Sequence, residues 1–392
     1  MSQDGRPSVR LLTATAWASL LLFAGSSAVV SVPLKDIGAD MNVGFVGKGL
    51  LAASRSCMLA IATFCMGYGA DRVGKRWFLS GGMLLAAAAL LWMGTTATYI
   101  GLVAGAMALG AGLASLEGLA SPLVAELHPK TVATQMNVLH AFFSAGLAAS
   151  SLFVGWALQG GASWHVLLKV TAGPALVIAA AFAVGRYPDA EVALRPAPLR
   201  IRDILGNRAL WPLAVAMALT AGCEGALLVW TPNFIQDEYG STALVGSYGL
   251  AVFAGTMAVG RFGTGAAARF VPLPRLMVGL ALAGAAATSC LALFGSLWVS
   301  LAALVAAGLC IACFWPSILS VAASRLAVGS ATLLATLSVA GIAGFAALPL
   351  AIGVIAQVAD LRVGFLLVPG ALLTAAAVLR SASATMRPIG SP

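Results

Sequence analysis

The chain has 392 residues, of which 60% are hydrophobic and only 9% are charged, and its formal net charge is +9. Its mean hydropathy of +0.98 is far above that of soluble domains, which excludes an ordinary soluble enzyme or binding module. The composition indicates an all-α protein that crosses a membrane many times, because helices satisfy every backbone polar group inside a bilayer.

Charged residues, glycines and prolines divide the chain into twelve apolar segments, each long enough to cross about 30 Å of hydrocarbon. We expect transmembrane helices at residues 11–34, 45–67, 77–97, 99–125, 134–158, 164–185, 209–235, 242–264, 274–294, 297–324, 331–356 and 362–382. The first segment already has the length of a span, so we expect it to remain as an anchor and not to be cleaved as a signal peptide.

The basic residues between these spans fall mostly on one side of the membrane. With the N-terminus inside, this side carries Arg6, Arg10, Arg72, Lys75, Arg76, Lys130, several arginines at 186–208, Arg261, Arg269, Arg275, Arg325, Arg380 and Arg387, whereas the other side has only Lys35, Lys48, Lys169 and Arg362. Lys and Arg in short loops stay in the cytoplasm, so the pattern predicts a multi-pass protein of the cell inner membrane with both termini cytoplasmic. The positive charge favours anionic lipid headgroups as partners and not nucleic acid.

No residue cluster in the sequence indicates enzymatic or metal chemistry. All six cysteines fall inside expected spans, and the pair Cys310 and Cys313 has no second pair of ligands. The three histidines are scattered and form no nucleophile–base set, and the sequence has no phosphate-binding loop for ATP. We therefore expect a protein that is not an enzyme and has no cofactor or metal.

A long polar stretch separates six spans from six. We expect an N-terminal half at residues 1–185, a cytoplasmic linker at 186–208, a C-terminal half at 209–382 and a cytoplasmic tail at 383–392. The segment Gly67–Arg76 between spans 2 and 3 has a weaker partner in Gly260–Arg269, between spans 8 and 9. Two related halves with a site between them near mid-membrane form the plan of transporters that work by alternating access.

The segment between spans 2 and 3 combines glycines, one acid and several bases, at Gly67, Asp71, Arg72, Gly74, Lys75 and Arg76. In a chain of twelve spans this pattern resembles the signature of the major facilitator superfamily. The resemblance implies a gating loop in which Asp71 pairs with bases across the junction of the halves, with Arg261 as the matching arginine of the second half. An acid beside helix ends and bases suits an ionic lock that breaks when the halves rock. The alternative is a solvated turn that only sets the topology.

A closer resemblance lies in span 4, where the stretch Gly112–Val124, with Glu117 at its centre, is similar to that of the fucose:proton symporter and glucose permease branch. Spans 5 and 10 have further similar stretches at Asn137–Phe143 and Phe314–Ser320. The resemblance implies proton-coupled sugar transport by a monomer. The branch also has an acid in span 1, but the corresponding region Gly25–Ser31 has none, which leaves the coupling ion and the sugar open.

Three charged residues lie well inside the expected spans, where each charge costs about 2.5–3.5 kcal/mol. They are Arg55, Glu117 and Glu224. Counting about 1.5 Å per residue from the cytoplasmic turns, we expect Arg55, Glu117 and His140 to lie in one layer that faces a central pocket. Asn137 precedes His140 by one helical turn and is expected on the same face.

Glu117 is the expected proton carrier, because a buried carboxylate gains and loses a proton as a nearby cation such as Arg55 moves. The alternative is a permanent Arg55–Glu117 pair in which Glu117 binds hydroxyl groups of the solute. For His140, an interior hydrogen bond explains the residue as well as contact with a solute does.

In the second half, Glu224 is the only acid at the centre of a span. A sugar site needs carboxylates and amides beside an aromatic ring, and Trp230, Asn233 and Trp315 are the candidates for it. For the two aromatic residues, packing or anchoring at the membrane interface is the alternative.

The preferred interpretation is a secondary transporter that moves a small polar solute, a monosaccharide or related polyol, by proton symport through Glu117. The alternatives within transport are a proton-coupled carrier of a small organic anion that uses Arg55, and an exporter of drugs or metabolites. Outside transport, the alternative is a receptor-like membrane scaffold. Competition of uptake by neutral sugars, or by organic anions alone, separates the first two.

Overall fold

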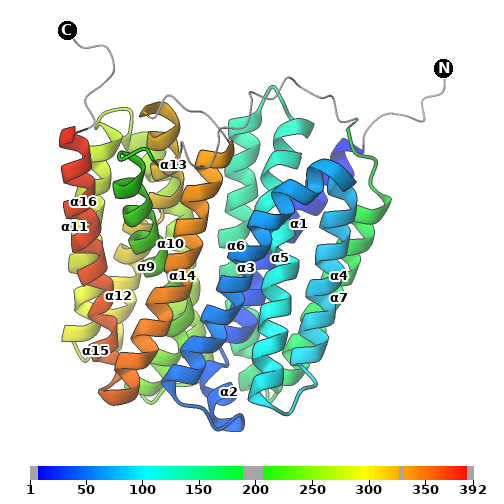
Figure 1. The fold of residues 1–392 in the computed structure, drawn as a ribbon. Coiled ribbons are helices and arrows are strands. Elements are labelled where there is room, and N and C mark those ends of the chain that lie inside the picture. Colours follow the sequence, from blue (N-terminus) through cyan, green and yellow to red (C-terminus); the bar gives the residue numbers. More distant parts are fainter. Residues whose placement is uncertain (1–7, 189–205, 326–330, 386–392) are drawn as a thin grey trace, which may run out of the picture.

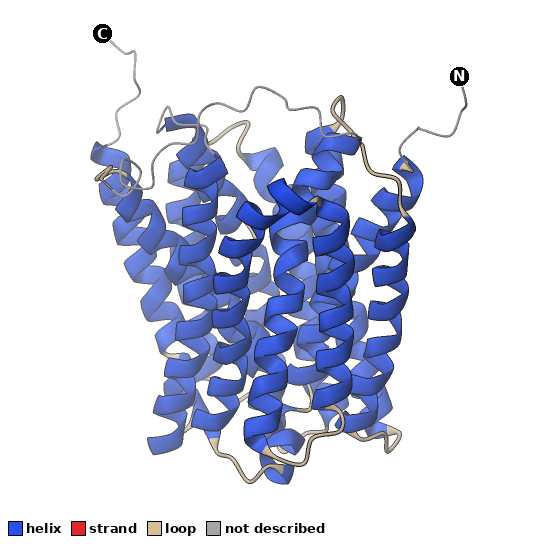
Figure 2. Cartoon of the chain, turned by 45° about the vertical axis from the view of Figure 1, so that its right-hand side comes forward, coloured by secondary structure: helices blue, strands red, loops and turns tan. Residues whose placement is uncertain are grey.

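The computed structural model describes residues 8–188, 206–325 and 331–385. This described part consists of helices joined by short turns and contains no strand (Figure 2). Within it, twelve helical segments are long and apolar enough to cross a membrane. The twelve spans expected from the sequence are thus confirmed, with ends that differ by a few residues.

The N-terminal half contains six spans and one short helix in the first connection. Its helices are α1 (Val9–Ser31), α2 (Leu34–Asp40), α3 (Phe45–Val73), α4 (Lys75–Met93), α5 (Tyr99–Leu127), α6 (Val132–Gln159) and α7 (Trp164–Val184). The short helix α2 was not expected from the sequence.

The C-terminal half contains the other six spans. Its helices are α9 (Leu210–Glu238), α10 (Ala243–Ala267), α11 (Leu273–Leu293), α12 (Leu297–Ile311), α13 (Phe314–Arg325), α14 (Ala331–Val358), α15 (Leu361–Phe365) and α16 (Leu367–Thr385). Span 10 is formed by α12 and α13, and span 12 by α15 and α16, because each is interrupted by a short break. Most of the expected linker, residues 189–205, lies outside the described part.

The two halves stand side by side, as Figure 1 shows. The start of α1 and the end of α16 lie at one edge of the bundle, and α2 lies at the opposite edge. We call these edges the terminal side and the α2 side. Between the halves, α3 packs on α14 and α6 packs on α10.

The α6–α10 contact brings two backbones unusually close. A Cβ atom at Gly155 of α6 would lie 2.2 Å from Oγ of Ser247 in α10, so only glycine fits there without a shift. The Ser151 hydroxyl donates to the carbonyl oxygen of Ser247 at 2.9 Å. Small residues at such a contact let helices of the two halves touch along their backbones.

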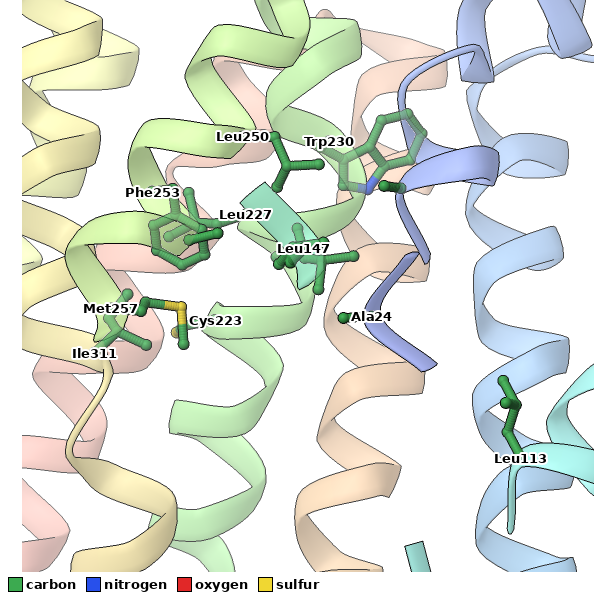
Figure 3. Packing of buried hydrophobic residues seen from close by; sticks show 14 of the residues in the cluster. Ala24, Leu113, Leu147, Cys223, Leu227, Trp230, Leu250, Phe253, Met257 and Ile311 are labelled. Atoms are coloured by element: carbon green, nitrogen blue, oxygen red, sulfur yellow. The ribbon is translucent and has the colours of Figure 1, made fainter. Parts of the chain in front are cut away.

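Apolar side chains fill the space within each half. Among the described spans, α9 has the largest fraction of buried residues. Figure 3 shows side chains of α9 beside those of α10, with α6 and α12 close by. The labelled residues are Cys223, Leu227 and Trp230 of α9, Leu250, Phe253 and Met257 of α10, Leu147 of α6 and Ile311 of α12. This packing holds α9 as a central element against which polar groups can be positioned.

The segment Gly67–Arg76 is mostly helical, which corrects the expectation of a loop. Helix α3 continues to Val73, and the turn consists of Gly74 alone, whose φ of +95° favours glycine. Similarly, α10 continues to Ala267, so Arg261 lies inside a helix and not in a loop. Polar residues at a membrane surface do not have to end a helix, because water is available to their side chains.

Candidate transport site

Arg55 points from α3 toward α1 and is held there by two serine hydroxyls. Its Nη1 donates to Ser27 Oγ at 2.9 Å and its Nη2 to Ser26 Oγ at 3.1 Å. The guanidinium lies over the ring of Phe23, with Cζ 5.6 Å from the ring centroid, and its buried Nε has no hydrogen-bond partner. These partners are neutral, and no ion pair joins Arg55 to an acid within the described residues.

Glu117 lies on α5, nearer to the terminal side than Arg55. A Cβ atom at Gly110 of α5 would lie 2.2 Å from the carbonyl oxygen of Arg55, and one at Gly118 would lie 3.8 Å from the methyl carbon of Thr63. Glu117 is thus level with Thr63, eight residues along α3 from Arg55, which is roughly 12 Å along the helix axis. The two charged residues do not share a layer, contrary to the expectation from the sequence.

The cause of this difference is the length of α3. The sequence predicts that span 2 ends at Gly67, but α3 continues to Val73, about 9 Å further, so Arg55 lies that much further from the end of its helix. The half-buried carboxylate of Glu117 has no hydrogen bond or ion pair with another described residue. The permanent Arg55–Glu117 pair is therefore not present in this conformation, and the two residues form separate sites.

Glu224 and Arg261 come together at the junction of the halves. The Nη2 atom of Arg261 lies 3.8 Å from Oε1 of Glu224, which is beyond hydrogen-bond distance. The Nη1 atom of Arg261 donates to Ser144 Oγ at 2.8 Å and to the carbonyl oxygen of His140 at 3.2 Å. Arg261 therefore joins an acid of its own half to the α6 backbone of the other half.

The other candidates on α6 are described in part. The His140 side chain is exposed, and only its carbonyl oxygen takes part in the Arg261 contact. The side chain of Asn137 lies outside the described part, so its place on this face stays a prediction.

Two residues expected at a sugar site are fully buried. Trp230 has no exposed surface, and its Nε1 donates to the carbonyl oxygen of Pro349 at 2.9 Å, while its ring packs near Phe45. Asn233 is equally buried and accepts a hydrogen bond from Lys48 Nζ at 3.1 Å. In this conformation both side chains serve packing and closure on the α2 side.

Trp315 differs from Trp230 because it is only partly buried. Its ring packs against α14 and α9, where a Cβ atom at Gly341 would lie 2.5 Å from the ring and 3.2 Å from Met217. This places an aromatic ring at the start of α13, immediately after the break in span 10.

The backbone of the expected gating loop is described throughout, but its side chains are described only at its end. Apart from their helical backbone, Gly67, Asp71 and Arg72 lie outside the described part. Lys75 forms an ion pair with Glu126 of α5, and Arg76 lies over the ring of Trp77, so both contact their own half. The gating role of the segment around Gly74 stays a prediction.

The α2 side is closed by polar contacts between the halves that the sequence did not suggest. Lys48 of α3 donates to Asn233 of α9, Asn233 donates to Asp237, and Asp237 pairs with Lys35 of α2 at 2.8 Å. Nearby, Gln236 Nε2 donates to the carbonyl oxygen of Val32 at 3.1 Å. We call Lys35, Lys48, Asn233, Gln236 and Asp237 the α2-side network.

Lys48 is 8% exposed, and its ammonium also lies 5.0 Å from the ring centroid of Phe45. A buried cation needs such partners, because the desolvation of an ammonium is costly. Within the described residues, no extensive contact joins α5 of the N-terminal half to α12 or α13 of the C-terminal half. The halves are therefore joined at the α2 side and along their flanks.

We expect Asp237→Asn to weaken closure of the α2 side, because it removes the acid that pairs with Lys35 and supports Lys48 through Asn233. The pair with Lys35 is partly exposed and worth about 1 kcal/mol, so the opening equilibrium should rise roughly fivefold. The measurement is the rate at which an impermeant maleimide labels Ser31→Cys, a buried position beside the network, in a cysteine-free background.

The matched control is Glu126→Gln, which removes an ion pair within one half on the terminal side. It should leave the labelling rate unchanged. Equal labelling of Asp237→Asn and its parent would contradict a gate at the α2-side network.

The structure thus has a cation without an acidic partner, Arg55, and an acid without a partner, Glu117, among the described residues. They lie at different depths between the closed α2 side and the terminal side. The model of the Major Facilitator Superfamily matches residues 16–288, well over half of the chain. The chain belongs to the Major Facilitator Superfamily. It is a membrane transporter of this type, as the resemblance implied.

Solved structures of the superfamily share the fold over nearly the whole chain. A bacterial homologue of the human lysosomal transporter Spinster, in an inward-facing and occupied conformation, has a TM-score of 0.80 at 16% identity, covering 96% of both chains. A mutant of the nucleoside transporter NupG has a TM-score of 0.80 at 10% identity, covering 95% of this chain and 99% of that one. At these identities the likeness concerns the fold alone.

A search of curated proteins finds no match. The matches to the superfamily do not confirm the closer resemblance to the fucose:proton symporter branch, which stays a prediction. What the structure adds is the partner set of Arg55, since Ser26 and Ser27 fall in the span 1 region where that branch has its acid.

Proposed function

We propose that this transporter moves a small organic anion together with a proton across the cell inner membrane. Arg55 binds the anion and Glu117 carries the proton. The terminal side faces the cytoplasm, as the positions of the basic residues indicate. With the α2 side closed, the conformation is then inward-facing.

The environment of Arg55 carries the proposal. An arginine has five N–H donors, of which two serve the serines of α1 and the one on Nε has no partner. A buried charge without a counter-ion is unfavourable, so a charged solute that arrives and leaves explains why such a cation is kept. The planar guanidinium matches a carboxylate with two parallel hydrogen bonds.

Glu117 supports the coupling to protons. Its carboxylate is half-buried and has no partner among the described residues, and it lies on the terminal side of Arg55. An acid in this setting can carry a proton when the site changes its access from one side to the other. Because Arg55 and Glu117 are separated by roughly 12 Å along the axis of α3, the proton and the anion occupy separate places in this proposal.

A neutral monosaccharide is the second candidate solute. The unpaired carboxylate of Glu117 and the partly buried ring of Trp315 favour it, because sugars bind to carboxylates and to aromatic faces. It leaves the charge of Arg55 without a role in binding.

A thermal-shift screen of the purified protein tests the proposal. The panel contains neutral hexoses and pentoses, and small mono- and dicarboxylates, each also measured with Arg55→Ala. We expect stabilisation by one or more carboxylates, lost in Arg55→Ala. Stabilisation by a neutral sugar that survives Arg55→Ala would replace the anion by a monosaccharide.

A further inference from the structure

In the contact between Glu224 and Arg261, the arginine donates hydrogen bonds to neutral groups and not to the acid. Within the described residues, Arg261 donates hydrogen bonds to two neutral oxygens of the other half, at Ser144 and at the His140 carbonyl. Its acid, Glu224, is 3.8 Å away and accepts no hydrogen bond from another described residue. The acid is 8% exposed, so water does little to stabilise its charge.

The field of the guanidinium is the main interaction that favours a charged carboxylate in this position. Charges this close interact strongly in a medium of low dielectric constant, even without a hydrogen bond. A proton on Glu224 removes that interaction, and Arg261 is then left with neutral partners from α6. The charge on Glu224 therefore decides how firmly Arg261 is held between the two halves.

We propose that Glu224 is a second proton-binding site and that Arg261 transmits its charge to the α6–α10 interface. With Glu224 charged, Arg261 is held on both sides and the halves stay joined through Ser144. With Glu224 protonated, the guanidinium is released from α9 and the interface rearranges. Arg261 is a positioning residue in this account, and Glu117 remains the carrier of the transported proton.

The helices around Glu224 offer few other charged groups. Arg261 is the charged group that acts on Glu224, and His140 is the titratable group of α6 beside Arg261. The remaining charged residues on helices packed against α9 are Arg10 of α1, Lys35, Asp36 and Asp40 of α2, Arg325 of α13 and Arg380 of α16, and α14 has none. A pH response that starts at this interface is thus assigned to Glu224, with His140 as the group to control for.

The test measures the distance between the halves without any solute. Spin labels are placed at Lys130→Cys and Arg269→Cys, two exposed positions after α5 and after α10, in a cysteine-free background. The distance distribution is compared in mildly acidic and mildly alkaline buffer. We expect a shift in the parent, and Glu224→Gln should show the acidic distribution in both buffers.

Matched variants keep the interpretation specific. Glu117→Gln and His140→Asn should retain the shift, Arg261→Lys should retain it because the charge remains, and Ser144→Ala should lose more than half of it. Infrared spectra of the same samples should contain the carbonyl band of a protonated acid that is missing in Glu224→Gln.

A parent-like shift in Glu224→Gln would overturn the proposal, and so would an unchanged carbonyl band in that variant. The inference rests on the proposed transport function, because the rearrangement of the interface would serve transport. Its test does not depend on that function, since the distances are measured without any solute. If the distance shift follows Glu224 while no carboxylate stabilises the protein, the anion assignment fails and this inference stands.

Discussion

Glu117→Gln is expected to abolish accumulation of the solute against its gradient while exchange of labelled for unlabelled solute continues. Glutamine has nearly the shape of glutamate but cannot release a proton, so the loaded site can still alternate between the two sides of the membrane. Uptake should then stop when the solute concentrations are equal. The measurement compares two assays in proteoliposomes, uptake driven by an imposed pH gradient and counterflow. Both use the carboxylate selected by thermal shift.

The control for Glu117→Gln is Glu126→Gln, which also neutralises a glutamate of α5 but at the exposed end beside Lys75. It should accumulate the solute as the parent does. Intact accumulation in Glu117→Gln would remove this residue from coupling, and Glu224 would become the acid to test next.

Ser27→Asp is expected to weaken binding of the anion strongly although Arg55 is left in place. Ser27 Oγ lies 2.9 Å from Nη1 of Arg55, so a carboxylate at this position reaches the guanidinium. It would provide the counter-ion that the protein lacks and compete with the solute. One or more charge-assisted hydrogen bonds are worth about 2–3 kcal/mol, which corresponds to a loss of affinity of roughly 30–150-fold.

Ser27→Ala is the matched variant, because it removes one hydrogen bond to Arg55 without adding a charge. It should weaken binding of the anion far less than Ser27→Asp, as titration by thermal shift or by calorimetry can show. Equal affinities in Ser27→Asp and the parent would show that the charge of Arg55 is not what the solute contacts. Under the monosaccharide alternative, binding of a neutral sugar should survive the change.

The twelve spans could be predicted because their signal is local. Each is a run of about 20 apolar residues, and the bilayer requires those residues to be helical. The exact ends of the helices, to within one or two turns, could not be predicted in the same way. The polar segment Gly67–Arg76 looks like a loop, but all of it up to Val73 is helix, and this alone moved Arg55 away from the layer of Glu117.

The sequence predicted which charged residues belong to the candidate site, but it did not predict the residues that contact them. Arg55, Glu117 and Glu224 were found because charge inside a span is rare. Their contacts involve residues far apart in the chain, such as Ser144 and Arg261, and no local pattern gives that pairing. The serines of α1 gave no signal, since serine is common in apolar helices.

The α2-side network was missed for a related reason. The charge pattern of the sequence places Lys35 and Lys48 on the side of the membrane opposite to the termini, but it says nothing about their partners. The bond from Lys48 to Asn233 joins residues 185 positions apart. The sequence predicts Asn233 as a solute contact, whereas in the structure it bonds to Lys48 and Asp237 at the α2 side.

The most direct test of the account is whether the anion brings a proton with it. The carboxylate identified by thermal shift is added to proteoliposomes that contain a pH-sensitive dye and the wild-type protein. We predict acidification of the interior in step with uptake of the carboxylate, and no acidification with Glu117→Gln. Uptake of the carboxylate without acidification, or acidification that follows only neutral sugars, would contradict the account.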